Sequence, residues 1–156
     1  MKILSALLIM LTLSACPTLT KKESLKTNFD RNKQLYIQAA SFMDSVGKNT
    51  SYTALDNSNG HIRLTNTGDE VRLLKKEEVP PAIAQLVLEE NINIDKQNNN
   101  IYFQINGTKV HGLTKTSGIL KTLTKDEPKI MFPWVTSYSV EPIENNWYTY
   151  RTNDDR

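Results

Sequence analysis

The sequence predicts an α+β fold with a mainly antiparallel sheet, one long N-terminal helix and one shorter helix. Over residues 27–47, apolar residues repeat at steps of three, four and seven, which is the period of an amphipathic helix. From residue 51 onward the pattern changes to short runs in which apolar and polar residues alternate, as in half-buried strands. These runs outnumber the helical segments and follow one another along the chain, which favours an antiparallel sheet. The 156 residues fit a single domain.

The long helix is predicted to begin at Thr27, whose hydroxyl can cap it, and to end at Gly47. Its apolar stripe consists of Phe29, Leu35, Tyr36, Ala39, Phe42, Met43 and Val46. A coiled-coil face is the alternative use of this stripe, but the stripe lasts under three heptads and has no leucine seam. We therefore expect the helix to pack on one face of the sheet and to leave the other face solvated.

The first strands are predicted directly after this helix. A short, weak strand at 52–55 is followed by turn residues at 56–60. Two alternating runs at 61–65 and 70–73 are joined by the turn 66–69, which indicates a hairpin.

A second, shorter helix is predicted over residues 77–90. Pro80 or Pro81 fits the first turn of a helix, where no backbone N–H is needed. Ile83, Leu86 and Val87 would form its buried side, together with Ala84.

The rest of the chain is predicted to form strands. The alternating runs 92–95 and 101–105 would form a hairpin across residues 96–100. Asn106-Gly107 has the chemistry of a two-residue turn before the next strand at 110–113. Later strands are expected at 117–123, 134–140 and 147–151, with a loop at 125–128 and a final turn at 144–146.

An apolar leader precedes the domain. Eleven of the first 15 residues are hydrophobic, against 49 of the 141 that follow. Lys2 and the apolar run 3–13 match the charged and hydrophobic regions of an export signal. As a helix, the run would reach about 16 Å, roughly half of the hydrocarbon core of a bilayer, so it is too short to span a membrane.

The leader ends in Leu13-Ser14-Ala15-Cys16, and this segment resembles the lipobox of bacterial lipoproteins. The resemblance implies that the Cys16 thiol receives a diacylglyceryl group and that a signal peptidase cuts after Ala15. It also implies that many bacteria then acylate the new amino group, with chains such as palmitate. An ordinary signal peptide with an incidental cysteine is the alternative. Cys16, however, is the sole cysteine of the chain and stands at the cleavage position.

The resemblance divides the chain into a signal peptide at 1–15, a lipidated Cys16 with a tether (16–26) and one globular domain at 27–156. Two or three acyl chains hold a protein on a bilayer without a second signal. Residue 17 is proline, whereas an aspartate at this place retains enteric lipoproteins in the inner membrane. The resemblance therefore favours the outer membrane, on its periplasmic or surface face, over the inner membrane.

Candidate catalytic groups are sparse in the sequence. Neither His61 nor His111 has a second ligand at metal-binding spacing. Ser117, before Gly118, lacks the known patterns of serine nucleophiles, and the paired carboxylates lie in predicted turns and helix ends. With Cys16 consumed by lipid, no thiol remains for a zinc site. We predict no catalytic residue, cofactor or metal, and the net charge of +2 together with export argues against nucleic acid as a partner.

Aromatic residues near the C-terminus are the candidate binding residues. Six of the 12 aromatics fall in the last 25 residues, beginning with Phe132. Strand alternation predicts that Tyr148 and Tyr150 share one face and that Trp147 lies on the other. An exposed face of this kind anchors protein partners or stacks on sugars, whereas the alternative is that the rings fill the core. The candidate residues are Trp134, Tyr138, Trp147, Tyr148 and Tyr150.

Together these observations predict a lipid-anchored protein of the cell envelope with a non-catalytic binding role. It would contact the membrane through Cys16 and bind a protein partner, either in envelope assembly or in immunity or exclusion. A small enzyme acting on cell wall or lipid is one alternative, and it would require convergent carboxylates or Ser and His in a concave pocket. A carrier of lipid or another small ligand is the second, and it would require an apolar cavity between helix and sheet.

Overall fold

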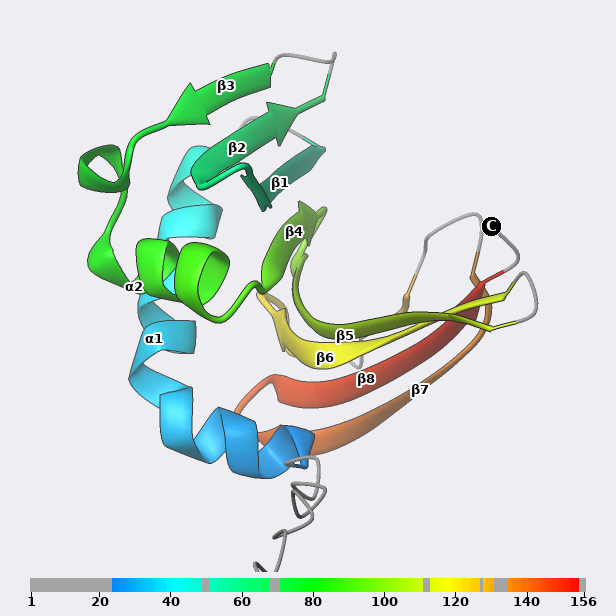
Figure 1. Cartoon of the computed structure of the whole chain (residues 1–156). Coiled ribbons are helices and arrows are strands. Elements are labelled where there is room, and N and C mark those ends of the chain that lie inside the picture. The colour runs from blue at the N-terminus through cyan, green and yellow to red at the C-terminus, as the bar shows by residue number, and fades with distance from the viewer. Residues whose placement is uncertain are drawn as a thin grey trace, which may run out of the picture.

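A computed structural model gives the fold and describes residues 24–48, 51–67, 71–110, 113–126, 128–130 and 135–154 (Figure 1). It confirms the α+β class, because the described strands form one antiparallel sheet with the helices on one face. The elements in chain order are α1 (Leu25–Val46), β1 (Tyr52–Ser58), β2 (His61–Asn66), β3 (Val71–Leu74), the 3₁₀ turn η1 (Lys76–Glu78), α2 (Pro81–Ala84), the π-helical turn η2 (Gln85–Glu89), β4 (Asn93–Gln97), β5 (Asn100–Val110), β6 (Leu113–Thr122), β7 (Val135–Glu144) and β8 (Trp147–Asp154).

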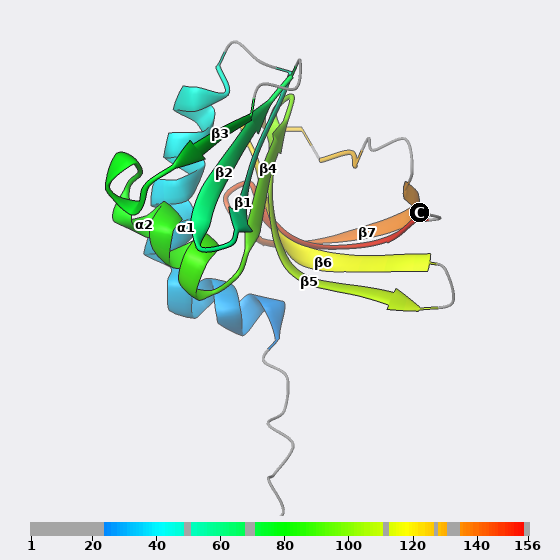
Figure 2. The same cartoon turned by 45° about the horizontal axis from the view of Figure 1, so that its top comes forward.

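The sheet has the strand order β3-β2-β1-β4-β5-β6-β8-β7 and is strongly curved (Figure 2). The helices cover one face, which we call the helix face, and the opposite face is concave. The strands β5 to β8 continue beyond the helices as a curved arm, which we define as residues 106–110, 113–117, 135–139 and 151–154. The sheet therefore has one end with helices packed against it and one end without.

α1 begins at Leu25, two residues before the predicted start. Ser24 is its cap rather than Thr27, because the backbone N–H of Thr27 donates to Ser24 Oγ at 3.1 Å. The predicted end at Gly47 is confirmed, since its N–H closes the helix on the Met43 carbonyl. The predicted stripe is also confirmed as the side that packs on the sheet, with Phe29, Tyr36, Ala39 and Met43 buried and Leu35, Phe42 and Val46 partly buried.

The main core lies between α1 and the helix face. Four aromatic rings meet there with centroids 5.0 to 6.4 Å apart: Phe29, Tyr36, Phe103 and Trp147. Aliphatic side chains from α2, η2 and the strands complete this core. Apolar burial of this extent is the main stabilising contribution to a fold of this size.

A second, smaller core corrects the expectation that the other face is solvated. Tyr102, Leu120 and Tyr150 point to the concave face, where Ile130 packs on them. Residues 128–130 follow β6 and run across this face, with Pro128 and Ile130 buried. The rings of Tyr102 and Tyr150 meet edge to face, 5.6 Å apart. The polar alternation of the strands could not reveal that a later segment covers this face.

Asparagine forms the tight turns of the sheet. All five non-glycine residues with positive φ in the described part of the chain are asparagines: Asn59, Asn91, Asn98, Asn145 and Asn146. Asn is one of the residues that enters this region at low cost. The turn predicted at 56–60 is in fact only Asn59-Gly60, because β1 continues to Ser58, which pairs with His61. The predicted hairpin at 61–73 and the final hairpin at 144–146 are confirmed.

The turn predicted at Asn106-Gly107 is wrong. Both residues lie inside β5, and the pairing with β6 continues as far as Val110 and Leu113. A bulge between Gln104 and Asn106 accounts for the dipeptide, because an extra residue in one strand uses the same permissive residue types as a turn. The link to β6 falls at residues 111–112, so His111 lies outside the described residues.

The helix predicted over 77–90 is shorter and broken. Lys76–Glu78 forms a separate 3₁₀ turn, and the helix itself runs from Pro81 to Glu89. Val79 and Pro80 are extended between them, because a residue that precedes proline is held out of the helical region. The predicted buried side is confirmed, with Ile83, Leu86 and Val87 fully buried.

Candidate functional site

The candidate aromatic residues do not form one exposed surface. Trp147 is 5% exposed and packs in the main core on the helix face, while Tyr150 is 4% exposed and belongs to the second core. Tyr148 is half-buried beside Tyr150, so the predicted division of faces along β8 is confirmed. Tyr138 on β7 is 45% exposed. Trp134 lies outside the described residues, as does Cys16.

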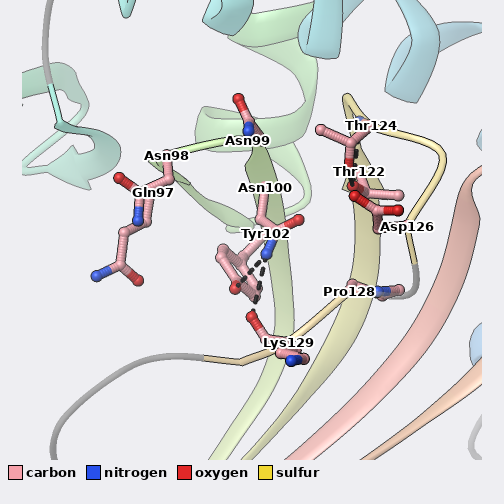
Figure 3. A pocket seen from close by; sticks show the side chains of 10 residues that line it. All are labelled: Gln97, Asn98, Asn99, Asn100, Tyr102, Thr122, Thr124, Asp126, Pro128 and Lys129. Atoms are coloured by element: carbon pink, nitrogen blue, oxygen red, sulfur yellow. Dashed lines mark hydrogen bonds between the residues drawn. The ribbon is translucent and has the colours of Figure 1, made fainter.

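The candidate site is a pocket on the concave face, between the β4–β5 turn and the segment after β6 (Figure 3). Its volume is about 340 Å³, at the lower end of the range of about 300–1,000 Å³ for ligand sites. Figure 3 shows Gln97 and the asparagines on one side, Thr122, Thr124 and Asp126 on the other, and Tyr102 between them. The lining residues are Gln97, Asn98, Asn99, Asn100, Tyr102, Thr122, Thr124, Asp126, Pro128 and Lys129.

The wall of carboxamides is positioned by a tight hairpin. Gln97 and Asn100 pair across the turn, and Asn98 takes a φ of 51° in the left-handed region. Two backbone hydrogen bonds anchor the turn to its neighbours: Asn98 N–H donates to the Ser51 carbonyl at 3.1 Å, and Leu123 N–H donates to the Asn99 carbonyl at 2.7 Å. The amide side chains therefore project from a backbone that is held on both sides.

Asn100 joins the two walls of the pocket. Its Nδ2 donates to the Tyr102 hydroxyl and to the Lys129 carbonyl, both at 3.2 Å. The second of these bonds ties the segment after β6 to β5, twenty-nine residues away in the chain. This bond helps to keep the pocket open at a fixed width, which lowers the entropy that a ligand must offset on binding.

The opposite wall continues the end of β6. The Thr122 N–H donates to the Asn146 carbonyl at 3.0 Å, which fixes the strand end against the β7–β8 turn. The Thr124 N–H donates to Thr122 Oγ1 at 3.3 Å, so the chain bends immediately after the strand. Asp126 is exposed at the rim of this wall.

Tyr102 forms the base of the pocket and is 2% exposed. Burial raises the pKa of its hydroxyl to about 12, and the hydrogen bond from Asn100 only partly opposes this shift. The charge of Asp95, which pairs with Tyr102 across β4 and β5, also raises the pKa of Tyr102. At neutral pH the Tyr102 hydroxyl is protonated and can take part in hydrogen bonds, but it cannot act as a base.

Several polar groups of the pocket have no internal hydrogen-bond partner. Within the described residues, none of the side chains of Gln97, Asn98, Asn99 and Asp126 forms a hydrogen bond or ion pair. Each carboxamide carries both a donor group and an acceptor group. The pocket can therefore exchange hydrogen bonds with a neutral polar group such as a peptide amide or a hydroxyl.

The carboxamide run is the feature that sequence reasoning missed. The alternation of the flanking runs predicts only a hairpin loop at 96–100. Four successive amide side chains, Gln97 to Asn100, are more than a two-residue turn requires. This surplus of amides is the feature of the sequence that could have indicated a binding site.

The other sequence candidates lie apart from the pocket. His61 is exposed beside the β1–β2 turn, with Nδ1 3.4 Å from the Asn59 carbonyl. Ser117 pairs with Arg151 within the sheet and does not lie in a turn. Over the described residues, no group of three or more His, Cys, Asp or Glu side chains could hold a metal ion. None of the helices described here has the length and apolar character needed to cross a membrane.

No protein-family model matches the chain. Comparisons with curated proteins and with solved structures return no match either.

Proposed function

We propose that the chain is a lipid-anchored protein of the bacterial cell envelope with a non-catalytic binding role. The anchor is Cys16 of the lipobox-like segment, and the outer membrane is the favoured location. The binding site is the carboxamide pocket between the β4–β5 turn and residues 122–129. Its ligand is a protein partner, which inserts a polar loop into the pocket.

The observation that carries this proposal is a preformed pocket in which the side chains of Gln97, Asn98 and Asn99 form no hydrogen bond with the described residues. Gln97, Asn98 and Asn99 offer donors and acceptors that match the peptide groups of a loop. The bonds of Asn100 to Tyr102 and Lys129 hold the walls before any ligand arrives. Tyr138 is exposed on the same face, since it pairs with Thr152, two residues from Tyr150, and tyrosine is enriched among residues that anchor protein interfaces.

The ionisable groups of the pocket support binding over catalysis. They are Asp126 at the rim, Lys129, and Tyr102, which is kept protonated by its raised pKa. Among the described residues, no histidine or serine lines the pocket to form an acid–base or nucleophilic pair with them. A carrier role would need space between α1 and the sheet, and Phe29, Tyr36 and other core side chains fill that region.

Site-specific photo-crosslinking in living cells tests the proposal. A photo-reactive amino acid at Asn99, in the pocket wall, is expected to yield one discrete adduct that mass spectrometry identifies as the same envelope protein in repeated experiments. The same probe at Asp44, on the exposed side of α1, is expected to yield no such adduct.

A matched pair of variants provides the control. Asn98→Gly removes one amide of the pocket but keeps the left-handed turn, because glycine adopts positive φ freely. Asn59→Gly makes the same change at a similar φ of 54° in the β1–β2 turn. We expect the adduct at position 99 to be lost with Asn98→Gly and retained with Asn59→Gly. If the probe at position 99 gives no adduct, or gives equal amounts of adduct in both variants, the pocket has no binding role.

A further inference from the structure

A second hollow lies on the arm, and it does not share residues with the carboxamide pocket. Its volume is about 180 Å³, and its lining includes Asn106, Lys115, Ser117, Arg151 and Asn153. Strand alternation and register place these side chains on the helix face, because Ser117 and Arg151 stand at even steps from Ile119 and Trp147 of the main core. Here, however, the arm extends beyond the helices, so the face is open.

The register brings two cationic side chains together. Ser117 pairs with Arg151 and Lys115 pairs with Asn153 on adjacent strands, β6 and β8. Lys115 and Arg151 are therefore diagonal neighbours on one face, a relationship that separates the two residues by about 7–8 Å. Both side chains are long enough to place their charged ends over the hollow between them.

Neither cation has an anionic partner in the described part of the chain. Both side chains are exposed, and neither forms an ion pair with any of the described residues. Among the described residues of this face, the carboxylate nearest by register is that of Glu141 on β7, diagonal to Arg151 and on the side away from Lys115. The lining of the hollow also carries the hydroxyl and amide groups of Asn106, Ser117 and Asn153, and Ser137 and Ser139 pair with Asn153 and Arg151 from β7.

We propose that this hollow binds a phosphate group. A phosphate offers several acceptor oxygens, which suit two cations on a diagonal with hydroxyl donors between them. The Arg151 guanidinium can hold two of these oxygens, and Lys115 supplies a point charge opposite. The hydroxyl of Ser117 lies between the two cations by register and can donate to the same group. A hydrogen bond of 2.8 Å from Asn153 Nδ2 to Ser137 Oγ fixes one rim of the site.

The phosphate can come from a soluble compound or from a lipid headgroup. α1 packs on this same face of the sheet, and it begins at Leu25, nine residues after Cys16 in the sequence. Nine residues, 16–24, reach at most about 30 Å when fully extended, so anchoring at Cys16 would keep this face near a membrane. Both sources would present the same phosphate group to the hollow. This phosphate site does not depend on the proposed role of the carboxamide pocket.

Nuclear magnetic resonance of the full chain in neutral detergent micelles tests the site. Inorganic phosphate is one probe, and phosphatidylglycerol added to the micelles is the other. We expect saturable shifts at the backbone amides of 115–117 and 151–153 and at the Arg151 side-chain N–H. Shifts with phosphate alone assign the site to soluble phosphate compounds, shifts with the lipid alone assign it to headgroups, and shifts with both assign it to either source. If neither probe gives saturable shifts, the proposal is wrong.

Substitutions test whether binding depends on the side chains of this hollow or only on the positive charge of the chain. Lys115→Met and Arg151→Met are each expected to weaken binding of the effective probe about tenfold. Arg72→Met removes an exposed cation on β3, at the other end of the sheet, and is expected to leave the affinity unchanged. Asn153→Asp keeps both cations but adds a carboxylate beside them, and it should abolish binding. An equal loss with Arg72→Met, or full binding by Asn153→Asp, would overturn the proposal.

Discussion

Lys96 of β4 donates a hydrogen bond of 2.9 Å from its Nζ to the carbonyl of Gly47, the residue that ends α1, 49 positions earlier in the chain. The lysine is only 6% exposed. Its ammonium group lies where the helix dipole is negative, which stabilises a buried cation. A single side chain thus ties the end of the long helix to the centre of the sheet.

Lys96→Met should lower the free energy of unfolding by about 1–2 kcal/mol, because the charged donor to the Gly47 carbonyl is lost. Urea denaturation of the full chain, followed by circular dichroism, measures the change. Lys48→Met is the control, since Lys48 is exposed and its replacement should change the stability by less than about 0.5 kcal/mol. Equal stability of the two variants would show that the Lys96 bond does not contribute.

Gly118→Ala should be strongly destabilising. A Cβ at this position would stand 1.9 Å from the Phe103 carbonyl oxygen on the neighbouring strand, so the backbone must move. We expect a loss of about 3 kcal/mol in denaturation experiments. Gly107→Ala makes the same change on β5, where the nearest atom is the end of the flexible Gln104 side chain, and it should be nearly neutral. A mild effect at Gly118 would contradict this packing.

Local sequence patterns predicted the parts of the fold that depend on local chemistry. The spacing of Phe29, Tyr36 and Met43 predicted the buried side of α1, because a helix repeats every 3.6 residues whatever it packs on. The alternation along β8 likewise predicted that Trp147 and Tyr150 lie on opposite faces.

Features that depend on distant segments could not be predicted in this way. Asn106-Gly107 has the same chemistry in a turn as in a bulge, and the pairing with Ser117 and Thr116 on β6 decides between them. The second core requires Ile130 to lie on Tyr102, and the sequence gives no spacing rule for such a contact. The same is true of the pocket, in which Thr122, Thr124 and Asp126 form the wall opposite the carboxamides.

Asn32→Ala should raise the stability of the chain. Asn32 lies inside α1 with φ −106° and ψ 15°, at a kink, and its buried Nδ2 has no hydrogen-bond partner. Alanine removes this unpaired donor and favours the helix, so we expect a gain of about 0.5–1 kcal/mol in urea denaturation. Asn28→Ala is the opposite case, because Asn28 Oδ1 accepts a 2.6 Å bond from the Tyr36 hydroxyl. Asn28→Ala should lower the free energy of unfolding by about 1 kcal/mol. A loss of stability in both variants would contradict the interpretation that the unpaired amide of Asn32 is unfavourable.

Stability should fall at high pH because of the two buried tyrosines of the second core. Burial raises the pKa of Tyr102 to about 12, and it raises the pKa of Tyr150 further. In the unfolded chain a tyrosine loses its proton near pH 10, so its contribution is complete below about pH 10 and is lost as the pH rises toward 12. For Tyr102 this amounts to about 2–3 kcal/mol.

Denaturation between about pH 8 and pH 11.5 measures this dependence. In Tyr102→Phe the free energy of unfolding should fall less steeply with pH, because phenylalanine has no proton to lose. Ultraviolet titration gives a second readout, in which Tyr102 and Tyr150 are expected to ionise at higher pH than a tyrosine of an unfolded chain. Ionisation of all the tyrosines together near pH 10 in the folded chain would contradict the burial of the pair.

The central claim is that the chain is held at the cell envelope by lipid on Cys16, and metabolic labelling tests it most directly. Cells that produce either the wild-type chain or Cys16→Ser are grown with labelled palmitate and then fractionated. The account predicts that the wild-type chain carries label and sediments with membranes, whereas Cys16→Ser carries none and leaves the membrane fraction. A Cys16→Ser chain that still incorporates palmitate and stays with the membranes would contradict it.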